Sequence, residues 1–480
     1  MRKKVLSALL CTAMTATLVT GCGGSDSSSS TTGGSTSGTT TTTTSESSEA
    51  GSSSADAGST SEVENTVSGD ASAADAFVVW GWNDDIKNVL DNEYKEANAE
   101  DYARVVFVNT GGSDTYQTKI DEMLNDSSNE LYPDVMGLEV DYVKKYVNSD
   151  VLCTGDDLGI TADDTAKMYQ YNKDLGTDAD GNMKAFFWQA TPGCFQLRAD
   201  LAKEYLGTTD PAEIQDKYFS SWDKVIEAAK KVNDASGGTC KLFSGYTEAF
   251  RVFSNSRATG WYDDSDTITI DPNMEEYMDV AQQLYEGDLT FNTDQWSEDW
   301  NANMTGDGKE TNAAIAYCGC PWFTYWCLNA DTWTGQTILV EGPQQFFWGG
   351  TGLAATAECS DKELAGRMIK WITCNPDGLV AINARSKDFV NNTDALATIK
   401  ADKAASASDM LYKKAKQNII EFYLPLADSI DASTATAEDQ TINDLWASQV
   451  AEFVQGNVDK DGAIEAFKAS VHDTYDYLNA

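Results

Sequence analysis

Between residues 77 and 138 short apolar runs alternate with amphipathic stretches, and this alternation leaves few folds open to the chain. The runs at 77–82, 103–108 and 132–138 predict three buried strands. Between them, apolar residues recur at helical spacing over 86–97 and 116–124. The order strand, helix, strand, helix, strand is the signature of a parallel sheet.

Parallel sheets bind ligands beyond the carboxyl ends of their strands. In this chain those ends are followed by residues 82–85, 109–114 and 139–141, which carry polar and acidic side chains. We therefore expect a ligand site along this edge of the predicted sheet.

The rest of the chain continues the alternation. A turn at 178–182 leads into an aromatic run at 183–188 and then a crossing strand at 189–201. Further strands are predicted at 242–246 and 313–322, and helices at 222–229, 277–284 and 362–373. This second set of strands and helices predicts a second α/β lobe.

The start of the chain has the pattern of a secretion signal. A basic segment, 1–4, precedes an apolar run, 5–19, that is too short for a stable membrane-spanning helix. Leu18, Gly21 and Cys22 resemble the bacterial lipobox, in which the cysteine becomes the lipidated first residue of the mature protein. An ordinary signal peptide is the alternative; the lipobox predicts an extracytoplasmic protein anchored to the cell membrane by acyl chains on Cys22.

From residue 23 to about 75 the chain consists almost entirely of Ser, Thr, Gly, Ala, Asp and Glu. Such a segment has too little apolar surface to fold alone. A flexible chain of this length spans roughly 40 Å. We expect it to be a disordered tether between the anchor and the folded part.

The charge of the chain limits its partners. With 76 Asp and Glu against 34 Lys and Arg, the net charge is −42. This excess argues against nucleic acids and against anionic lipid surfaces, which attract basic proteins. Membrane association is therefore expected through the lipid anchor alone.

The cysteines and the acidic loops are the candidate metal ligands of the chain. Eight cysteines follow Cys22, so disulfides are possible, but neither Cys318 with Cys320, two apart on a predicted strand, nor Cys359 with Cys374, at the two ends of a predicted helix, has the geometry for an internal bond. The chain has a single histidine, His472, which argues against a zinc site. The segment 178–182 resembles part of a calcium loop but lacks the first and last ligands, so a hairpin turn is the better interpretation. We expect no metal and no cofactor.

The order of several short motifs resembles that of the solute-binding proteins of ABC importers, in the carbohydrate branch that includes maltose-binding protein. The resemblance covers residues 77–480, and its motifs lie downstream of the lipobox and tether. The motifs are Val79-Trp80-Gly81-Trp82, Pro133-Asp134-Val135, Asp180-Gly181-Asn182, Arg198-Ala199-Asp200, Cys320-Pro321-Trp322, Trp348-Gly349-Gly350-Thr351-Gly352 and Glu363-Leu364-Ala365.

The resemblance implies a periplasmic-binding-protein-like α/β fold, in which two α/β lobes enclose a ligand cleft and close by a hinge motion. Each lobe is then built from separated segments. The implied division is a signal peptide at 1–21, a tether at 22–75, lobe one at 76–190 plus 351–398, and lobe two at 191–350 plus 399–480.

The resemblance also implies which residues contact the ligand. By position in the motifs, the predicted ligand contacts are Trp82, Asp84, Asp85, Glu139, Asp141, Tyr246, Glu248, Trp322, Trp348, Gly349 and Gly350. A sugar ring has an apolar face and a rim of hydroxyls, so it is held by flat aromatic rings together with carboxylates and amides. Trp261, Trp296 and Trp300 are further candidates, whereas Trp222, Trp371 and Trp446 lie in helical patterns and are expected to be packing residues.

Together with the lipobox, the resemblance implies a lipid-anchored, monomeric binding protein. We expect it to capture a sugar, most simply an oligosaccharide, and to deliver it to the transmembrane subunits of an ABC permease. A peptide or polyamine remains an alternative ligand. A surface sensor or adhesion module is an alternative function. A glycoside hydrolase with two carboxylates is a weaker one, because the chain lacks G-x-S-x-G and H-E-x-x-H motifs and resembles non-enzymes.

Overall fold

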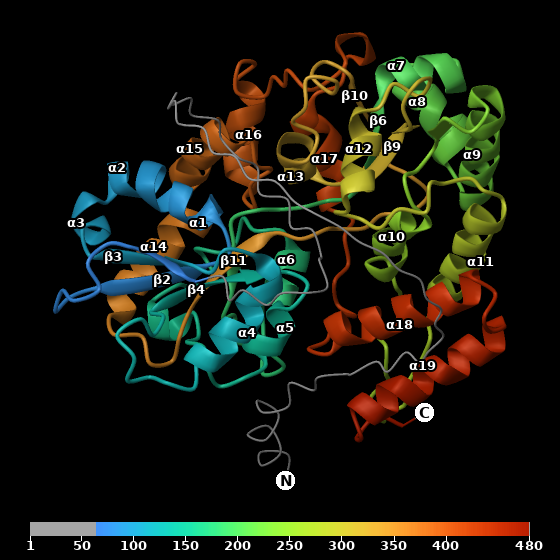
Figure 1. Ribbon diagram of the computed structural model, residues 1–480. Coiled ribbons are helices and arrows are strands. Elements are labelled where there is room, and N and C mark those ends of the chain that lie inside the picture. Colours follow the sequence, from blue (N-terminus) through green and yellow to red (C-terminus); the bar gives the residue numbers. More distant parts are fainter. Residues whose placement is uncertain (1–63, 480) are drawn as a thin grey trace, which may run out of the picture. The chain divides into compact units, whose positions relative to one another are not determined.

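The computed structural model describes residues 64–479 (Figure 1). The predicted signal peptide, the predicted lipidation site Cys22 and most of the predicted tether lie outside this range. Among the described residues, no helix combines the length and the apolar character needed to cross a membrane.

A mixed six-stranded sheet forms the first half of the fold, with the order β1-β3-β2-β4-β11-β5. Strand β2 pairs in parallel with both β3 and β4, which confirms the parallel sheet predicted from the sequence. Strand β11 pairs antiparallel with β4 and β5. The strands are β1 (Thr66–Ser68), β2 (Phe77–Gly81), β3 (Val105–Asn109), β4 (Val135–Glu139), β5 (Phe186–Phe187) and β11 (Thr351–Ala355).

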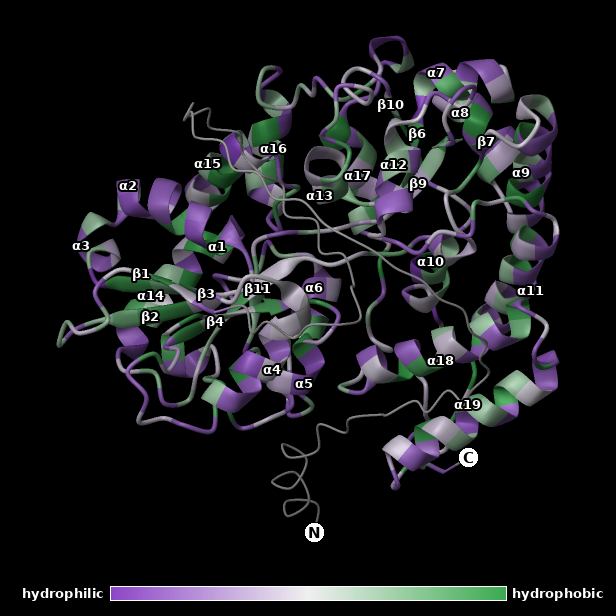
Figure 2. Cartoon of the chain, viewed as in Figure 1, coloured by the Kyte–Doolittle hydropathy of each residue, from purple (hydrophilic) through white to green (hydrophobic). Residues whose placement is uncertain are grey.

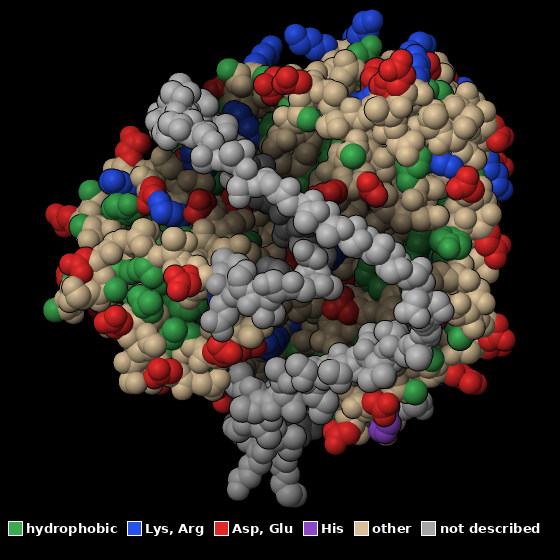
Figure 3. Space-filling view, viewed as in Figure 1, with side chains coloured by type: hydrophobic (Ala, Val, Ile, Leu, Met, Phe, Trp, Pro, Cys, Tyr) green, Lys and Arg blue, Asp and Glu red, His purple; other side chains and the backbone are tan. Residues whose placement is uncertain are grey.

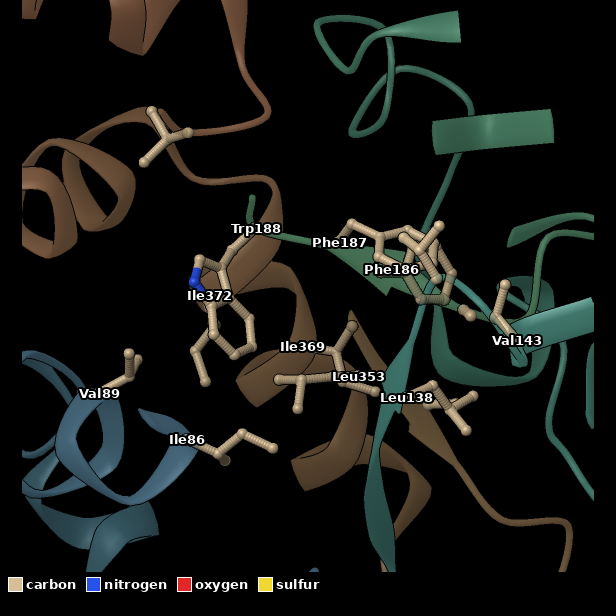
Figure 4. Close-up of a cluster of buried hydrophobic side chains, with 14 of the residues drawn as sticks. Ile86, Val89, Leu138, Val143, Phe186, Phe187, Trp188, Leu353, Ile369 and Ile372 are labelled. Atoms are coloured by element: carbon tan, nitrogen blue, oxygen red, sulfur yellow. The ribbon is translucent and has the colours of Figure 1, made fainter. Parts of the chain in front are cut away.

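The helices beside this sheet begin where the sequence provides caps. Helix α1 (Asp84–Val89) starts at Asn83, whose side chain accepts a hydrogen bond from the backbone N–H of Asp85. Helix α14 (Lys362–Thr373) starts at Asp361 in the same way and occupies the range predicted for it. Their buried residues meet those of the sheet in one hydrophobic core, as Figure 4 shows for Ile86 and Ile372.

The edge strand β1 differs from the sequence prediction, because it lies inside the stretch assigned to the tether. Thr66, Val67 and Ser68 pair antiparallel with Phe107 to Asn109 of β3. A polar segment that cannot fold alone can still add a strand to a preformed sheet edge, where backbone hydrogen bonds supply the contact.

The second half of the fold has its own core and smaller sheets. Strands β10 (Thr337–Val340), β6 (Cys194–Arg198) and β9 (Ala316–Gly319) form an antiparallel sheet, and β7 (Cys240–Lys241) pairs in parallel with β8 (Ala313–Ala314). The predicted strand at 242–246 is wrong, because the chain leaves β7 after Lys241 and forms the 3-10 turn η6 (Tyr246–Ala249). The predicted α/β class with two lobes is confirmed.

Helices pack around this second core with their apolar faces inward. The main ones are α9 (Trp222–Ser236), α11 (Pro272–Glu286), α18 (Asp439–Val454) and α19 (Lys460–Thr474). Figure 2 shows the hydrophobic and hydrophilic faces of α9 and α11, which follow the predicted helical spacing. A third, aromatic core cluster receives buried residues from α12 (Glu298–Thr305) and α13 (Pro321–Trp326). The short helix α10 (Phe250–Ser254) contributes its buried apolar residues to the second core.

Two crossing segments that connect the halves run side by side. Pro192 and Phe347 form an antiparallel bridge, and the N–H of Gly193 donates to the carbonyl of Phe346 at 2.7 Å. A later helix, α17 (Ile419–Ala427), buries its apolar residues in the first core. The residue limits of the two lobes remain a proposal.

The remaining elements complete the two halves. They are α2 (Lys95–Ala97), α3 (Ala99–Tyr102), α4 (Ser113–Met123), α5 (Val143–Val147), α6 (Gln170–Gly176), α7 (Ala199–Leu201), α8 (Pro211–Ile214), α15 (Pro376–Ser386), α16 (Thr393–Ala401), and the 3-10 or π turns η2 (Leu90–Tyr94), η3 (Asp156–Leu158), η4 (Ala202–Leu206), η5 (Gln215–Phe219) and η7 (Lys413–Ala415).

Acidic side chains are spread over the face of the molecule shown in Figure 3, in keeping with the large negative charge of the chain. The eight cysteines between residues 64 and 479 are free thiols, and seven of them are buried.

Candidate functional site

The carboxyl end of β4 carries two of the predicted acidic residues. Glu139 is the last residue of β4, and its carboxylate accepts a hydrogen bond from the backbone N–H of Asp141 at 2.7 Å. Both side chains are partly buried. The sheet therefore places two carboxyl groups next to each other at the edge where the sequence predicted a ligand site.

Asp141 is bound by an arginine from the other half of the fold. Nη1 of Arg251, on α10, donates to both carboxylate oxygens of Asp141 at 2.6 Å each. The neighbours of Asp141 belong to the first hydrophobic core, and the neighbours of Arg251 belong to the second. This ion pair therefore joins the two lobes.

Two tryptophans complete the group. The guanidinium carbon of Arg251 lies 5.5 Å from the ring centre of Trp348, and the rings of Trp348 and Trp322 are 5.2 Å apart. The indole N–H of Trp322, on α13, donates to the backbone carbonyl of Trp348 at 3.1 Å. We call Glu139, Asp141, Arg251, Trp322 and Trp348 the interlobe cluster.

Glycines after Trp348 allow the close approach of these groups. Gly349 has φ +65°, and a Cβ there would lie 2.9 Å from Oε1 of Glu139 and 3.4 Å from Nε1 of Trp322. Gly350 has φ +123°, and its carbonyl accepts a hydrogen bond from the N–H of Val140 at 3.2 Å. A side chain at position 349 would both strain the backbone and fill the space between Glu139 and Trp322.

Burial and the neighbouring charge of Asp141 raise the pKa of Glu139 well above its usual value, although Arg251 and backbone N–H groups oppose the shift. A neutral carboxylic acid can donate a hydrogen bond as well as accept one. The cluster thus offers a ligand both kinds of hydrogen-bonding group next to aromatic rings.

Glu248 is connected to this cluster through the side chains of Trp300 and Trp296. It is fully buried and accepts hydrogen bonds from the indole N–H of Trp300, from the backbone N–H of Cys318 at 3.3 Å and from the amide of Gln295 at 3.5 Å. Burial raises the pKa of Glu248 to about 7, against the opposing effect of these donors. The ring of Trp300 contacts that of Trp296, which in turn contacts Trp348.

Other predicted contact residues make their interactions elsewhere. Trp82 packs edge-on against Tyr116 in the first core, with ring centres 5.3 Å apart and 9% of its surface exposed. Asp84 accepts a hydrogen bond from Asn109, which links the ends of β2 and β3. Tyr246 packs edge-on against Tyr285.

Asp85 belongs to a second acidic pair. Burial and the charge of Asp388 raise its pKa to about 6, while the amide of Asn83 opposes the shift. Asp388 is itself buried and accepts hydrogen bonds from the side chains of Trp188 and Gln189, on the first crossing segment. These contacts place Asp85 near the segments that connect the lobes.

The sequence prediction missed two residues of the site. Arg251 stands three residues after the predicted contact Glu248, which is about one helical turn along the chain. Nothing else in the sequence marked Arg251 as a residue of the site. Asn255 donates from its side chain to the carbonyl of Phe347 at 2.7 Å and so holds the segment before Trp348.

The other aromatic candidates separate by burial. Trp261 and Trp300 are fully buried. The expected packing residues Trp222 and Trp446 are also buried, with at most 5% of their surface exposed. Trp296 is 41% exposed. Cys320, before Trp322, is buried in the third core cluster.

Within residues 64–479, no group of His, Cys, Asp and Glu side chains is arranged to hold a metal ion. In the turn at 178–182, Asp178 accepts hydrogen bonds from the backbone N–H groups of Asp180 and Asn182 and pairs with Lys184. Thr177 and Met183 form an antiparallel bridge, which confirms the predicted hairpin turn.

The arrangement can bind a solute that offers both an apolar face and hydroxyl groups. The aromatic rings provide flat apolar surface, and the carboxyl groups and the guanidinium provide hydrogen bonds. The site joins the two lobes, so a bound solute would contact both.

Solved structures share this fold. The crystal structure of an extracellular solute-binding protein of family 1 matches with TM-score 0.70 and 16% identity, over 84% of this chain and 100% of that chain. The ABC-transporter-associated binding protein of B. animalis subsp. lactis Bl-04, in complex with β-1,6-galactobiose, matches with TM-score 0.66 and 18% identity, over 84% and 98%.

The galacto-N-biose-/lacto-N-biose I-binding protein of the ABC transporter from Bifidobacterium longum, in complex with lacto-N-biose, matches with TM-score 0.64 and 13% identity, over 84% and 98%. At these identities the likeness concerns the fold. It agrees with the periplasmic-binding-protein-like architecture expected from the sequence.

No curated protein sequence matches the chain. A family model does match: that of the bacterial extracellular solute-binding proteins, over residues 89–410, which is most of the folded part. The chain therefore belongs to the family of bacterial extracellular solute-binding proteins.

Proposed function

We propose that this protein is the lipid-anchored binding subunit of an ABC importer, which captures an oligosaccharide between its lobes and delivers it to a membrane permease. The observation that carries the proposal is the interlobe cluster, where the carboxyl groups of Glu139 and Asp141 meet Trp322 and Trp348 from the other half of the chain.

The chemistry of the cluster suits a carbohydrate. Tryptophan rings pack against the C–H face of a sugar, and carboxyl groups accept or donate hydrogen bonds at its hydroxyl rim. The related structures in complex with β-1,6-galactobiose and lacto-N-biose support this class of ligand. The proposed action is binding and lobe closure, without a chemical reaction.

A thermal-shift screen tests the ligand class. The protein would be produced from residue 64 onward, because a start at residue 76 would remove strand β1. β-1,6-Galactobiose, lacto-N-biose, acarbose and a panel of other mono- and oligosaccharides would be added. A ligand at 100 times its Kd stabilises the folded state by about 2.7 kcal/mol, which for a chain of this size raises Tm by roughly 3 °C.

A saturable rise in Tm with one sugar, without product on prolonged incubation, is the expected result. A rise with peptides or polyamines and with no sugar would contradict the proposed ligand class. Breakdown of a sugar would identify an enzyme instead.

Substitution of the cluster tests the site. Trp322→Ala is expected to weaken binding of that sugar at least about tenfold, because it removes the stacking surface and the hydrogen bond to Trp348. Trp326→Ala is the matched control, since Trp326 is on the same helix and 58% exposed. Equal affinities of wild type and Trp322→Ala, measured by calorimetry, would exclude Trp322 from the site.

The anchor is tested separately. In the full chain expressed in a bacterium, Cys22→Ala is expected to move the protein from the detergent phase to the aqueous phase. A Cys22→Ala protein that stays in the detergent phase would contradict lipidation at this cysteine.

A further inference from the structure

Trp348, the central ring of the interlobe cluster, has little free surface. Only 5% of it is exposed. Its ring is contacted by Trp322 at 5.2 Å, by Phe323 at 5.6 Å and by Trp296 at 5.9 Å, and the guanidinium of Arg251 lies over it. A ligand that reaches this cluster must therefore find its aromatic surface on the rings around Trp348.

Among the rings that contact Trp348, Trp296 has the most open surface. Phe323 is fully buried and Trp322 is partly buried, whereas Trp296 is 41% exposed. A single exposed aromatic side chain is ordinary on a protein surface. What distinguishes Trp296 is its ring contact with Trp348 of the interlobe cluster, with ring centres 5.9 Å apart.

The backbone of Trp296 is held in an unfavourable conformation. Its φ is +71°, in the left-handed region that non-glycine residues rarely adopt. Unfavourable backbone conformations persist where the surrounding structure enforces them, and they gather at ligand-binding positions. The strain therefore gives an observation that is independent of the exposure of the ring.

The residues next to Trp296 fix its position. Its ring packs on Trp300 with centres 5.2 Å apart, and the indole N–H of Trp300 donates to the buried carboxylate of Glu248. The amide of the preceding residue, Gln295, donates to the same carboxylate at 3.5 Å. Ser297 caps α12 by accepting from the N–H of Trp300. These contacts hold the ring of Trp296 against Trp300 and Trp348, while 41% of the residue remains exposed.

We propose that Trp296 is a ligand-contacting residue, whose exposed ring stacks on the apolar face of a sugar that also occupies the interlobe cluster. This inference rests on the proposed carbohydrate-binding function and adds a stacking surface to the site. Trp326 is more exposed, at 58%, but it makes no ring contact with another aromatic side chain in the described part of the chain. Exposure by itself therefore does not select Trp296; its contacts and its backbone do.

Binding of the full chain and its variants to a glycan array, followed by calorimetry with the tightest glycan, tests the inference. Trp296→Ala is expected to raise Kd roughly tenfold, and Trp296→Tyr is expected to recover most of the loss, because tyrosine restores a flat ring. Tyr477→Ala is the control, since Tyr477 is an aromatic residue of the same exposure, 41%, near the carboxyl end of the chain. Its Kd is expected to equal that of the wild type.

The outcomes separate this inference from the proposed function. Tight binding by the wild type with unchanged Kd in Trp296→Ala overturns the role of Trp296 and leaves the proposed function in place. No binding by the wild type to any glycan overturns both. An equal loss in Trp296→Ala and Trp296→Tyr, together with a lowered Tm in both, overturns the inference in favour of a packing role.

Discussion

At the scale of single residues, burial and hydrogen bonding act in opposite directions on the pKa of Glu248. Its carboxylate accepts hydrogen bonds from three donors, which favour the ionised form, yet its complete burial raises its pKa from 4.5 to about 7. The titratable groups that face it, Tyr317, Cys318 and Cys327, have pKa values raised by burial, so they are neutral at neutral pH.

This residue should affect the pH dependence of stability. Between pH 4.5 and about 7 the folded state keeps the proton of Glu248 and the unfolded state loses it, so this group lowers stability as pH rises, by about 3 kcal/mol in order of magnitude. In Glu248→Gln that decline is expected to disappear. Urea unfolding at several pH values measures it.

The exposed residue Glu358 provides the control, and Glu358→Gln is expected to keep the wild-type pH dependence. The same slope in Glu248→Gln and wild type between pH 4.5 and 7 would contradict the raised pKa.

The backbone of Trp296 gives a second prediction for a single residue. Glycine in place of alanine usually destabilises a protein, but at φ +71° alanine has an unfavourable conformation that glycine does not. Trp296→Gly is therefore expected to be more stable than Trp296→Ala by roughly 1 kcal/mol, measured by urea unfolding. A more stable alanine variant would show that the left-handed conformation is not kept in solution.

At the scale of elements, helix α14 depends on a glycine for its close packing. A Cβ at Gly366 would lie 2.0 Å from the carbonyl oxygen of Leu158, in the 3-10 turn η3. Glycine in a helix normally lowers stability relative to alanine. Here the order is reversed, because the helix and the turn are too close for a methyl group.

Gly366→Ala is expected to lower the free energy of unfolding by about 2–3 kcal/mol, since α14 or η3 must move. Gly462→Ala, in α19, is the control: its Cβ would lie 3.0 Å from a carboxylate oxygen of Asp459, the N-cap that accepts from the N–H of Gly462, and would meet no backbone of another element, so its stability should stay within about 1 kcal/mol of the wild type. An unchanged or higher stability of Gly366→Ala in denaturant titration would mean that η3 moves at no cost.

At the scale of the whole described molecule, side-chain contacts join the two lobes besides the crossing segments. Arg251 binds Asp141, and the amide of Gln117 on α4 donates to the amide oxygen of Gln440 on α18 at 3.0 Å. The two lobes therefore touch through side chains as well as through the crossing segments.

Loss of the ion pair should favour separation of the lobes. Arg251→Met leaves the partly buried Asp141 without its partner beside Glu139, and separation of the lobes would expose this unpaired carboxylate more fully to water. The radius of gyration from small-angle X-ray scattering is expected to increase relative to wild type. Arg367→Met is the control, because Arg367 pairs with Asp101 within one lobe. Identical scattering curves of wild type and Arg251→Met would show that the pair does not hold the lobes together.

The sequence by itself determined the local structure and the class of the fold. The period of apolar residues predicted β2, β3 and β4, the helices between them, and the range of α14. It also pointed to the strand end at Glu139 and to the segment at Trp348. It failed for β1 and for residues 242–246, where pairing with a sheet edge and the packing of a turn outweigh local pattern.

Only the tertiary structure decided which of the 13 tryptophans and 76 acidic residues come together. Asp141 meets Arg251 across 110 positions of the chain, and Trp322 meets Trp348 across 26. Apolar periodicity encodes which face of each helix or strand is buried, not which loops then meet. That choice follows from the packing of two separate cores against each other, which places Arg251 beside Asp141, buries Trp300 and leaves the ring of Trp296 exposed.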